Sequence, residues 1–289
     1  MQKISYYFVR YIVFLFSFTP FWLLYLISDF FSFVLFNIIP YRKKIVLKNL
    51  QNSFPNKSEK EINSIAKKFY KHLTDILLES VKGFTLSDKK ILKRYKYEES
   101  KVVTEYFKNK KNIILAGAHY GNWEWGILMI SHILPFKMYG IYKPMSNKYV
   151  DKYIKKLRTK RGTELVPMKL TNRIFKKESD EIQAIMLVGD QSPSDRKKAL
   201  WVKFLNQDTA CIHGIELYAK IYKLPVVYYS IGKEKRGHYK ITAELIMDDP
   251  RKSKKGEITH IFMKKLENTI KKTPELWLWS HKRWKHKLK

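Results

Sequence analysis

Residues 112–126 read Asn-Ile-Ile-Leu-Ala-Gly-Ala-His-Tyr-Gly-Asn-Trp-Glu-Trp-Gly, and this stretch decides what kind of fold the chain adopts. It begins with Asn112 to Leu115, an apolar, β-branched run that is typical of a buried strand. An apolar segment from Trp125 to Ile133 follows and favours a helix. The stretch therefore predicts a strand that leads into a helix through a short polar turn.

The two residues with reactive side chains in this turn are His119 and Glu124. On a single helix, at about 100° per residue, they would point about 140° apart and would not meet. If His119 instead ends the strand and Gly121 and Asn122 make the turn, the Glu124 carboxylate can fold back onto the imidazole. A general base needs such a partner. The structural alternative is a histidine satisfied by the helix N-terminus and a glutamate that helps to cap it.

The pattern of strands and helices continues along the chain. Ser58 and Glu61 form a predicted capping box ahead of a long amphipathic helix that ends near Gly83. Further strands are expected at 137–142, 163–166, 183–188, 224–231 and 239–245, and helices at 147–160, 211–222 and 257–271. Strands that alternate with helices predict an α/β fold with a mixed, largely parallel central sheet flanked by helices.

Composition indicates polyanionic partners. The 289 residues include 57 Lys and Arg against 26 Asp and Glu, a formal charge of +31. Nucleic acid, anionic lipid headgroups and an acidic carrier protein all match this charge. The one cysteine, Cys211, excludes an intramolecular disulfide and is expected to be a small core residue.

The N-terminus predicts membrane attachment. Tyr11 to Ser28 is a run of 18 uncharged residues, near the lower limit for a spanning helix. Pro20 lies in its middle and should kink or break the helix, and the next apolar run, 30–39, is too short to span. We therefore expect residues 1–45 to form a kinked spanning, re-entrant or interfacial anchor, and residues 46–289 a catalytic domain. Basic flanks favour a cytoplasmic main body.

Several common catalytic signatures are missing from the sequence. It has no Gly-x-Ser-x-Gly elbow, phosphate-binding loop, dinucleotide fingerprint or His-Glu-x-x-His helix. The other histidines lack ligand spacing, so we expect no metal site.

Five blocks of the sequence resemble the bacterial lipid A late acyltransferases, within the lysophospholipid acyltransferase superfamily. His119 and Glu124 match the His-x4-Asp/Glu motif of that superfamily. The other blocks, in the family's order, are Asn49 to Pro55, Tyr142-Lys143-Pro144 with Arg158 to Gly162, Gly189-Asp190-Gln191, and Trp279 to Trp284. The chain departs from the usual pattern at Lys143, where arginine is commoner, and after Asp190, which puts the acceptor lipid in question.

The resemblance implies transfer of a fatty acyl group from an acyl carrier protein thioester to a hydroxyl of a membrane glycolipid, for which a lipid A precursor is the family's typical substrate. His119 would be the general base, oriented by Glu124, and no cofactor would be needed beyond the acyl donor. Candidates for binding headgroup phosphates or the developing oxyanion are Lys143, Arg158, Asp190 and Gln191. Asp190 could instead fix the cationic side chain of Lys143 or Arg158. For each of them the structural reading, a solvated basic helix or a turn residue, stays open.

The implied setting is the cytoplasmic side of the bacterial inner membrane, with acyl carrier protein, the glycolipid acceptor and an anionic membrane surface as partners. Another phospholipid, glycolipid or aminolipid acceptor is the nearest alternative. More distant alternatives are a membrane lipid hydrolase, which would use water in place of the acceptor, and a non-enzymatic, basic membrane protein that binds nucleic acid. Nucleic-acid binding is not expected, because it would have no need for the His119 and Glu124 turn.

Overall fold

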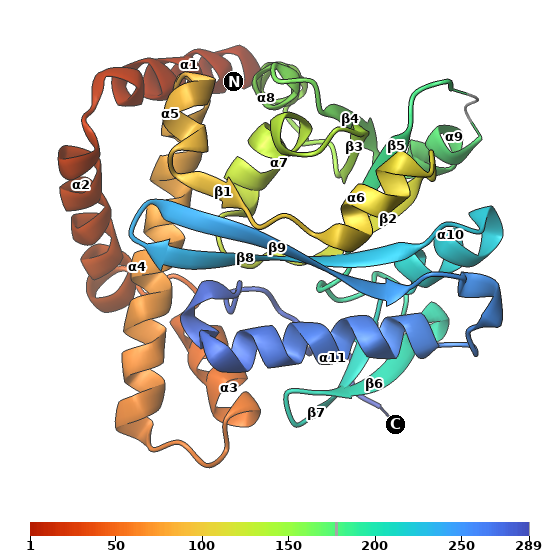
Figure 1. The fold of residues 1–289 in the computed structure, drawn as a ribbon. Helices are drawn as coiled ribbons and strands as arrows, with labels where there is room; N and C mark the ends of the chain where they lie inside the picture. The colour runs from red at the N-terminus through yellow and green to blue at the C-terminus, as the bar shows by residue number, and fades with distance from the viewer. Residues whose placement is uncertain (177–178, 289) are drawn as a thin grey trace.

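A mixed sheet lies at the centre of the molecule, with helices on both of its faces (Figure 1). The computed structural model describes residues 1–176 and 179–288. Within these residues the strand order is β1-β9-β8-β2-β5-β3-β4, and all neighbours are parallel except β8 and β9. The strands are β1 (Tyr95–Tyr97), β2 (Ile113–Gly117), β3 (Lys137–Tyr142), β4 (Glu164–Pro167), β5 (Gln183–Val188), β8 (Val226–Lys235) and β9 (His238–Met247).

The fully buried strand β2 divides two hydrophobic cores. Ile114 and Ala116 point into one core, and Ile113 and Leu115 point into the other. A central strand covered on both faces needs apolar residues at every position, and this explains the unbroken run that starts at Ile113. The predicted α/β class with a largely parallel sheet is confirmed.

The helices also follow the predicted pattern. The long helix α4 (Glu59–Gly83) begins with the expected capping box, in which Ser58 Oγ accepts from Glu61 N at 3.3 Å and Ser58 N donates to the Glu61 carboxylate at 2.9 Å. The remaining helices are α3 (Lys43–Ser53), α5 (Asp88–Leu92), α6 (Lys101–Lys108), α7 (Trp123–Ile133), α8 (Lys148–Thr159), α9 (Thr171–Phe175), α10 (Gly214–Tyr222) and α11 (Glu257–Lys272).

One predicted boundary is wrong. The helix expected from Cys211 begins only at Gly214, because Cys211 ends a separate hairpin of β6 (Leu200–Phe204) and β7 (Gln207–Cys211). The two turn residues, Leu205 and Asn206, both have positive φ, as a two-residue hairpin turn requires. Cys211 is buried, as expected of a core residue.

The N-terminal segment forms two helices in place of one. The helix α1 (Gln2–Phe18) ends before Thr19 and Pro20, and α2 (Phe21–Phe33) then turns away and continues as a π-helical turn at Val34–Ile38 (Figure 1). The break at Pro20 is therefore confirmed. It also shifts the candidate span: among residues 1–176 and 179–288, one helix is long and apolar enough to cross a membrane, Phe21–Ile38. This helix combines the end of the first apolar run with most of the second.

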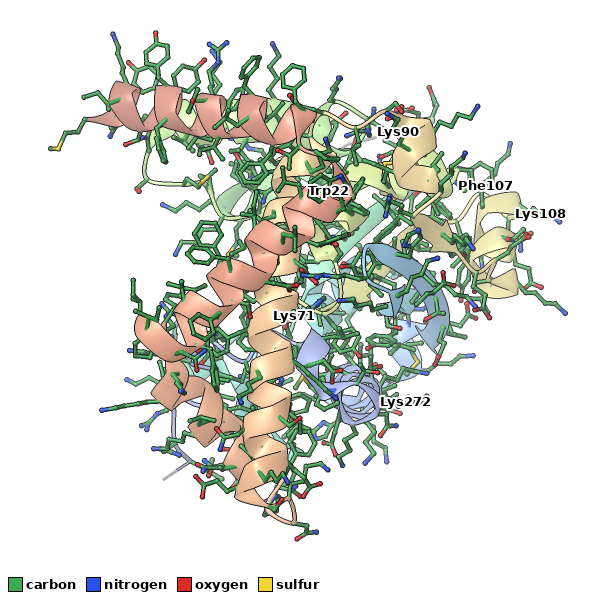
Figure 2. All side chains as sticks on the ribbon, turned by 90° about the vertical axis from the view of Figure 1, so that its left-hand side faces the viewer. Trp22, Lys71, Lys90, Phe107, Lys108 and Lys272 are labelled. Carbon is green, nitrogen blue, oxygen red and sulfur yellow. The ribbon has the colours of Figure 1, made fainter. Side chains whose placement is uncertain are left out.

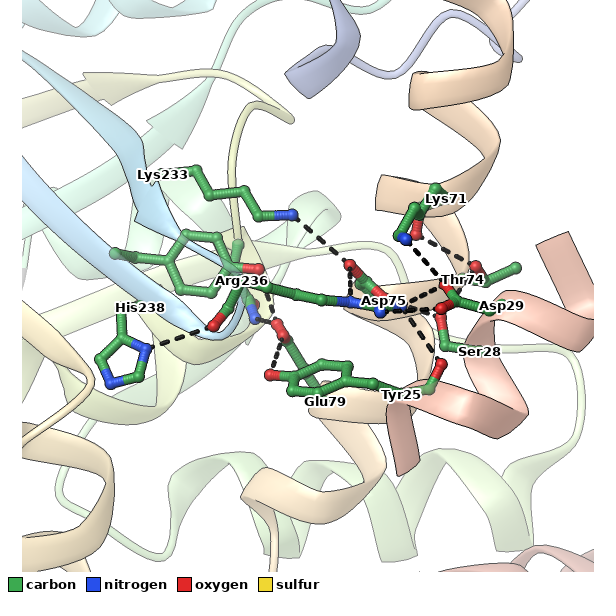
Figure 3. Close-up of polar contacts among 12 residues, drawn as sticks. Tyr25, Ser28, Asp29, Lys71, Thr74, Asp75, Glu79, Lys233, Arg236 and His238 are labelled. Carbon is green, nitrogen blue, oxygen red and sulfur yellow. Dashed lines mark hydrogen bonds and ion pairs between the residues drawn. The ribbon is translucent and has the colours of Figure 1, made fainter. Parts of the chain in front are cut away.

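Polar side chains fasten α2 to the body of the molecule. Ser28 donates to Asp75 on α4 at 2.7 Å, and Arg236, after β8, bridges Asp75 and Asp29 at 2.6 Å each (Figure 3). Tyr25 donates to the buried Glu79 of α4 at 2.9 Å. One side of α2 is thus bound to α4, while its apolar side chains, Trp22 among them, face outward (Figure 2).

Candidate active site

The predicted turn between strand and helix is present, and it separates His119 from Glu124. His119 follows β2, and Glu124 lies in the first turn of α7. Between them, Gly121 has a φ of +63°, and a Cβ there would lie 2.1 Å from the Ile231 carbonyl oxygen, so only glycine fits. Asn122 caps α7 by accepting a hydrogen bond from Trp125 N at 2.9 Å.

The partner of His119 is Asp190, which follows β5. Strands β2 and β5 are parallel neighbours, so their carboxyl ends bring the two residues together. The imidazole Nδ1 lies 2.8 Å from Asp190 Oδ1, and the His119 backbone N–H donates to Asp190 Oδ2 at 3.1 Å. The Trp277 indole donates to the same Oδ2 at 2.9 Å. Three contacts thus hold one buried carboxylate against the ring.

This pairing differs from our expectation for Glu124. The Glu124 carboxylate forms a bidentate ion pair with Arg158 of α8, in which the shortest nitrogen–oxygen distances are 2.7 Å. Glu124 lies in the first turn of α7, where its carboxylate faces α8. Asp190, at the end of the neighbouring strand β5, lies beside the His119 ring instead. Asp190, expected to fix a cation, holds His119 instead, and Arg158 is fixed by Glu124.

The charges in the site stabilise the ionised forms of both His119 and Asp190. Burial lowers the pKa of His119, but Asp190 and Glu124 outweigh it and raise that pKa above its usual value. Burial opposes charge on Asp190, yet its contacts with His119 and Trp277 bring the pKa of this carboxyl below its usual range. The pair is therefore arranged to stabilise an imidazolium.

The remaining predicted site residues take different positions. Gln191 Nε2 lies 3.4 Å from His119 Nε2, so the amide sits at the ring nitrogen that Asp190 leaves free. Lys143 follows β3 and is exposed, and in the described part of the chain it forms no ion pair or side-chain hydrogen bond. The structure thus groups His119, Asp190 and Gln191 in one cluster and Glu124 with Arg158 in another.

Three aromatic residues near the site were not singled out as site residues. The edge of the Trp123 ring approaches His119 with centroids 5.5 Å apart, and Trp277 bonds to Asp190. His281 Nε2 accepts from the backbone N–H of Ser192, two residues beyond Asp190. Trp277 and Trp279 are buried, so these two aromatic side chains near the C-terminus pack inside the molecule.

This geometry suits proton transfer to or from a bound hydroxyl. With Nδ1–H donating to Asp190, Nε2 carries the lone pair that a general base needs. In the described residues, no group of three or more His, Cys, Asp or Glu side chains is arranged to hold a metal ion.

Comparison with known proteins supplies the chemical class. The family model described as bacterial lipid A biosynthesis acyltransferase matches residues 1–286. No curated protein matches the sequence.

Proposed function

Since the chain belongs to the bacterial lipid A biosynthesis acyltransferase family, we propose a specific reaction for its site. Enzymes of this family transfer acyl groups, so the chain is an acyltransferase. The proposed donor is a fatty acyl thioester of acyl carrier protein. The proposed acceptor is a hydroxyl of a membrane glycolipid, a lipid A precursor on the pathway to lipopolysaccharide.

The observation that carries this proposal is the Asp190–His119 pair, with Nε2 left as the free base. In the proposed step, Nε2 removes the proton of the acceptor hydroxyl while its oxygen attacks the thioester carbonyl carbon. A carbon–oxygen bond forms and the carbon–sulfur bond breaks, and the imidazolium returns its proton to the departing thiolate. Gln191 would yield its place at Nε2 to the hydroxyl. No covalent acyl-enzyme and no cofactor are required.

Glu124 and Arg158 have a supporting role in this proposal. Their ion pair is partly exposed, with 20% and 24% of the two side chains accessible, so a substrate can reach it. A guanidinium with two bonds to Glu124 keeps further N–H groups for a headgroup phosphate or the oxyanion. Lys143, exposed after β3, is a weaker candidate for the same task.

The charge and the N-terminus suit the proposed substrates. A formal charge of +31 favours both an acidic carrier protein and an anionic membrane surface. Of the 27 exposed large hydrophobic side chains among the described residues, 17 lie within residues 1–41. Because polar contacts fasten α2 along α4, we propose that α1 and α2 lie in the interface of the inner membrane, with the catalytic domain on its cytoplasmic side.

The decisive experiment follows both substrates. Purified enzyme is incubated with acyl carrier protein thioester, with and without a lipid A precursor, and the lipids are analysed by mass spectrometry. We expect an acceptor heavier by one acyl chain, and thioester consumption that depends on the acceptor. Equal release of free fatty acid with and without acceptor would instead identify a hydrolase.

A further inference from the structure

A basic cleft lies behind the catalytic turn, between α4, the end of β8 and the 3-10 turn at Pro274–Leu276. Its volume is about 290 Å³. Four lysines line it, two from α4 and two from β8: Lys68, Lys71, Lys233 and Lys235. None of them belongs to the His119 or Glu124 clusters, so the cleft is a separate feature of the molecule.

His72 lines the same cleft and lacks hydrogen-bond partners. Its side chain is almost fully buried, and neither ring nitrogen makes a hydrogen bond within the described residues. The Gly121 carbonyl lies near the ring and favours its charged form, but burial and Lys233 prevail and lower the pKa of His72 to about 3. A buried neutral imidazole that has only the Gly121 carbonyl nearby, and no hydrogen bond of good geometry, is unfavourable unless a ligand supplies a partner.

The charges that line the cleft leave room for an anion. Lys71 pairs with Asp29 at 3.1 Å and Lys233 with Asp75 at 3.4 Å, on the two sides of Arg236 (Figure 3). In contrast, Lys68 and Lys235 form no ion pair within the described residues. The two acidic side chains at the cleft, Glu234 and Glu275, do not balance the four lysines.

We propose that this cleft binds a phosphate group, held directly by Lys68, Lys235 and His72. A phosphate monoester carries a charge of about −1.5 to −2 and three acceptor oxygens. Two unpaired ammonium groups match that charge, and the imidazole N–H supplies a neutral donor. The 290 Å³ also leaves space for the group to which the phosphate is attached.

The position of the cleft favours a phosphate carried by a membrane lipid. Lys71 also lines a neighbouring hollow of about 400 Å³, whose other wall is α2 and the π-helical turn, including Phe33 and Phe36. The basic cleft thus opens beside the apolar N-terminal surface, where a headgroup and its acyl chains would meet the protein together. Occupation of the cleft requires no acyl transfer, so the proposal is independent of the proposed reaction.

A binding experiment on the full-length protein in detergent tests this site. Calorimetry would measure affinity for two probes, inorganic phosphate and dihexanoyl phosphatidic acid. The double variant Lys68→Gln/Lys235→Gln should weaken binding of the lipid at least tenfold. The control, Lys60→Gln/Lys96→Gln, removes two exposed lysines outside the cleft, one of them also from α4, and should bind as the unaltered protein does.

A second variant keeps the outcome clear if charge removal perturbs folding. His72→Leu should weaken binding several-fold and raise the melting temperature without ligand, because it removes an unpartnered buried polar ring. A lower melting temperature with unchanged affinity would show a merely structural His72 and contradict the proposal. Tighter binding of inorganic phosphate than of the lipid would support a phosphate site in the cleft but would contradict a membrane lipid as its ligand. Failure of both probes to bind the unaltered protein would overturn the site itself.

Discussion

The two carboxylates near the turn between β2 and α7, Asp190 and Glu124, differ in burial and partner. Asp190 has 3% of its side chain exposed and bonds to the imidazole, to a backbone N–H and to an indole. Glu124 is 20% exposed and bonds to a guanidinium. The acidic residue of the His-x4-Asp/Glu motif, Glu124, therefore does not hold the motif's own histidine. Residues that are neighbours in the sequence thus form the turn, but the order of the strands determines the partner of the histidine.

The largest effect should come from His119, the residue that Asp190 holds. His119→Ala removes the proposed base and should lower kcat by about 10²- to 10⁴-fold in the acyl-transfer assay. Membrane association should be unchanged. His132→Ala, on the same helix as Glu124 but at its far end, is the control and should keep normal activity. A fully active His119→Ala protein would refute the assignment of the base.

Asp190→Asn should have the next largest effect, about 10²-fold or more in kcat, because the amide cannot stabilise the imidazolium. The pH profile adds a specific sign. Asp190 helps to raise the pKa of His119, and the base acts only when neutral, so activity rises with pH through that pKa. The variant should move this acidic limb of kcat/KM to lower pH. Asp195→Asn, an exposed aspartate five residues on, should leave the limb in place.

Glu124→Gln should reduce kcat/KM by about tenfold, less than the Asp190 variant, because a partly exposed ion pair contributes less than a buried one. Arg158→Lys loses the two-pronged contact and should have a similar effect. If the pair acts as a unit, the double variant should be no worse than either single one. If the losses in kcat/KM of the two single variants multiply fully in the double variant, the two residues act separately, unlike the coupled pair of Asp190 and His119.

The smallest of these effects is expected at Glu79, which lies behind both pairs. Its carboxylate accepts from Asn122, the cap of α7, at 2.7 Å, and from Tyr239 at 2.7 Å. Glu79→Gln should shift the turn slightly and lower kcat by about threefold to tenfold. Glu105→Gln, exposed on α6, is the matched control.

The same variant has a consequence for stability. Burial, with Asp75 next, raises the pKa of Glu79 from 4.5 to about 7. The folded protein therefore holds this proton in a range where the unfolded chain has lost it, and stability falls as pH rises from about 4.5 to 7. Urea titrations at several pH values should show a flatter dependence for Glu79→Gln than for the unaltered protein. An identical slope would contradict the raised pKa.

Much of the fold could be predicted from sequence patterns. The β-branched run at Ile113 and Ile114 marked the central strand, the Ser58–Glu61 box marked the start of α4, and Pro20 marked the break between α1 and α2. The turn that holds His119 followed from Gly121 and Asn122. These features depend on local geometry, which a few neighbouring residues determine.

The partners across the site could not be predicted in the same way. Asp190 is 71 residues from His119, and only the adjacency of β5 and β2 brings them together. Likewise, the β6–β7 hairpin interrupts a pattern that favoured a helix at Cys211. Strand order and packing depend on the whole chain, so no local window contains them.

The hydrogen bond from Trp277 to Asp190 also determines the order in which the His119 site is completed during synthesis. Trp277 follows the last strand of the central sheet, β9, and the helix α11, whereas the apolar helices α1 and α2 precede the sheet. Chains fold progressively from the N-terminus during synthesis. Asp190 therefore receives its indole hydrogen bond only after α1, α2 and the whole central sheet have been synthesised.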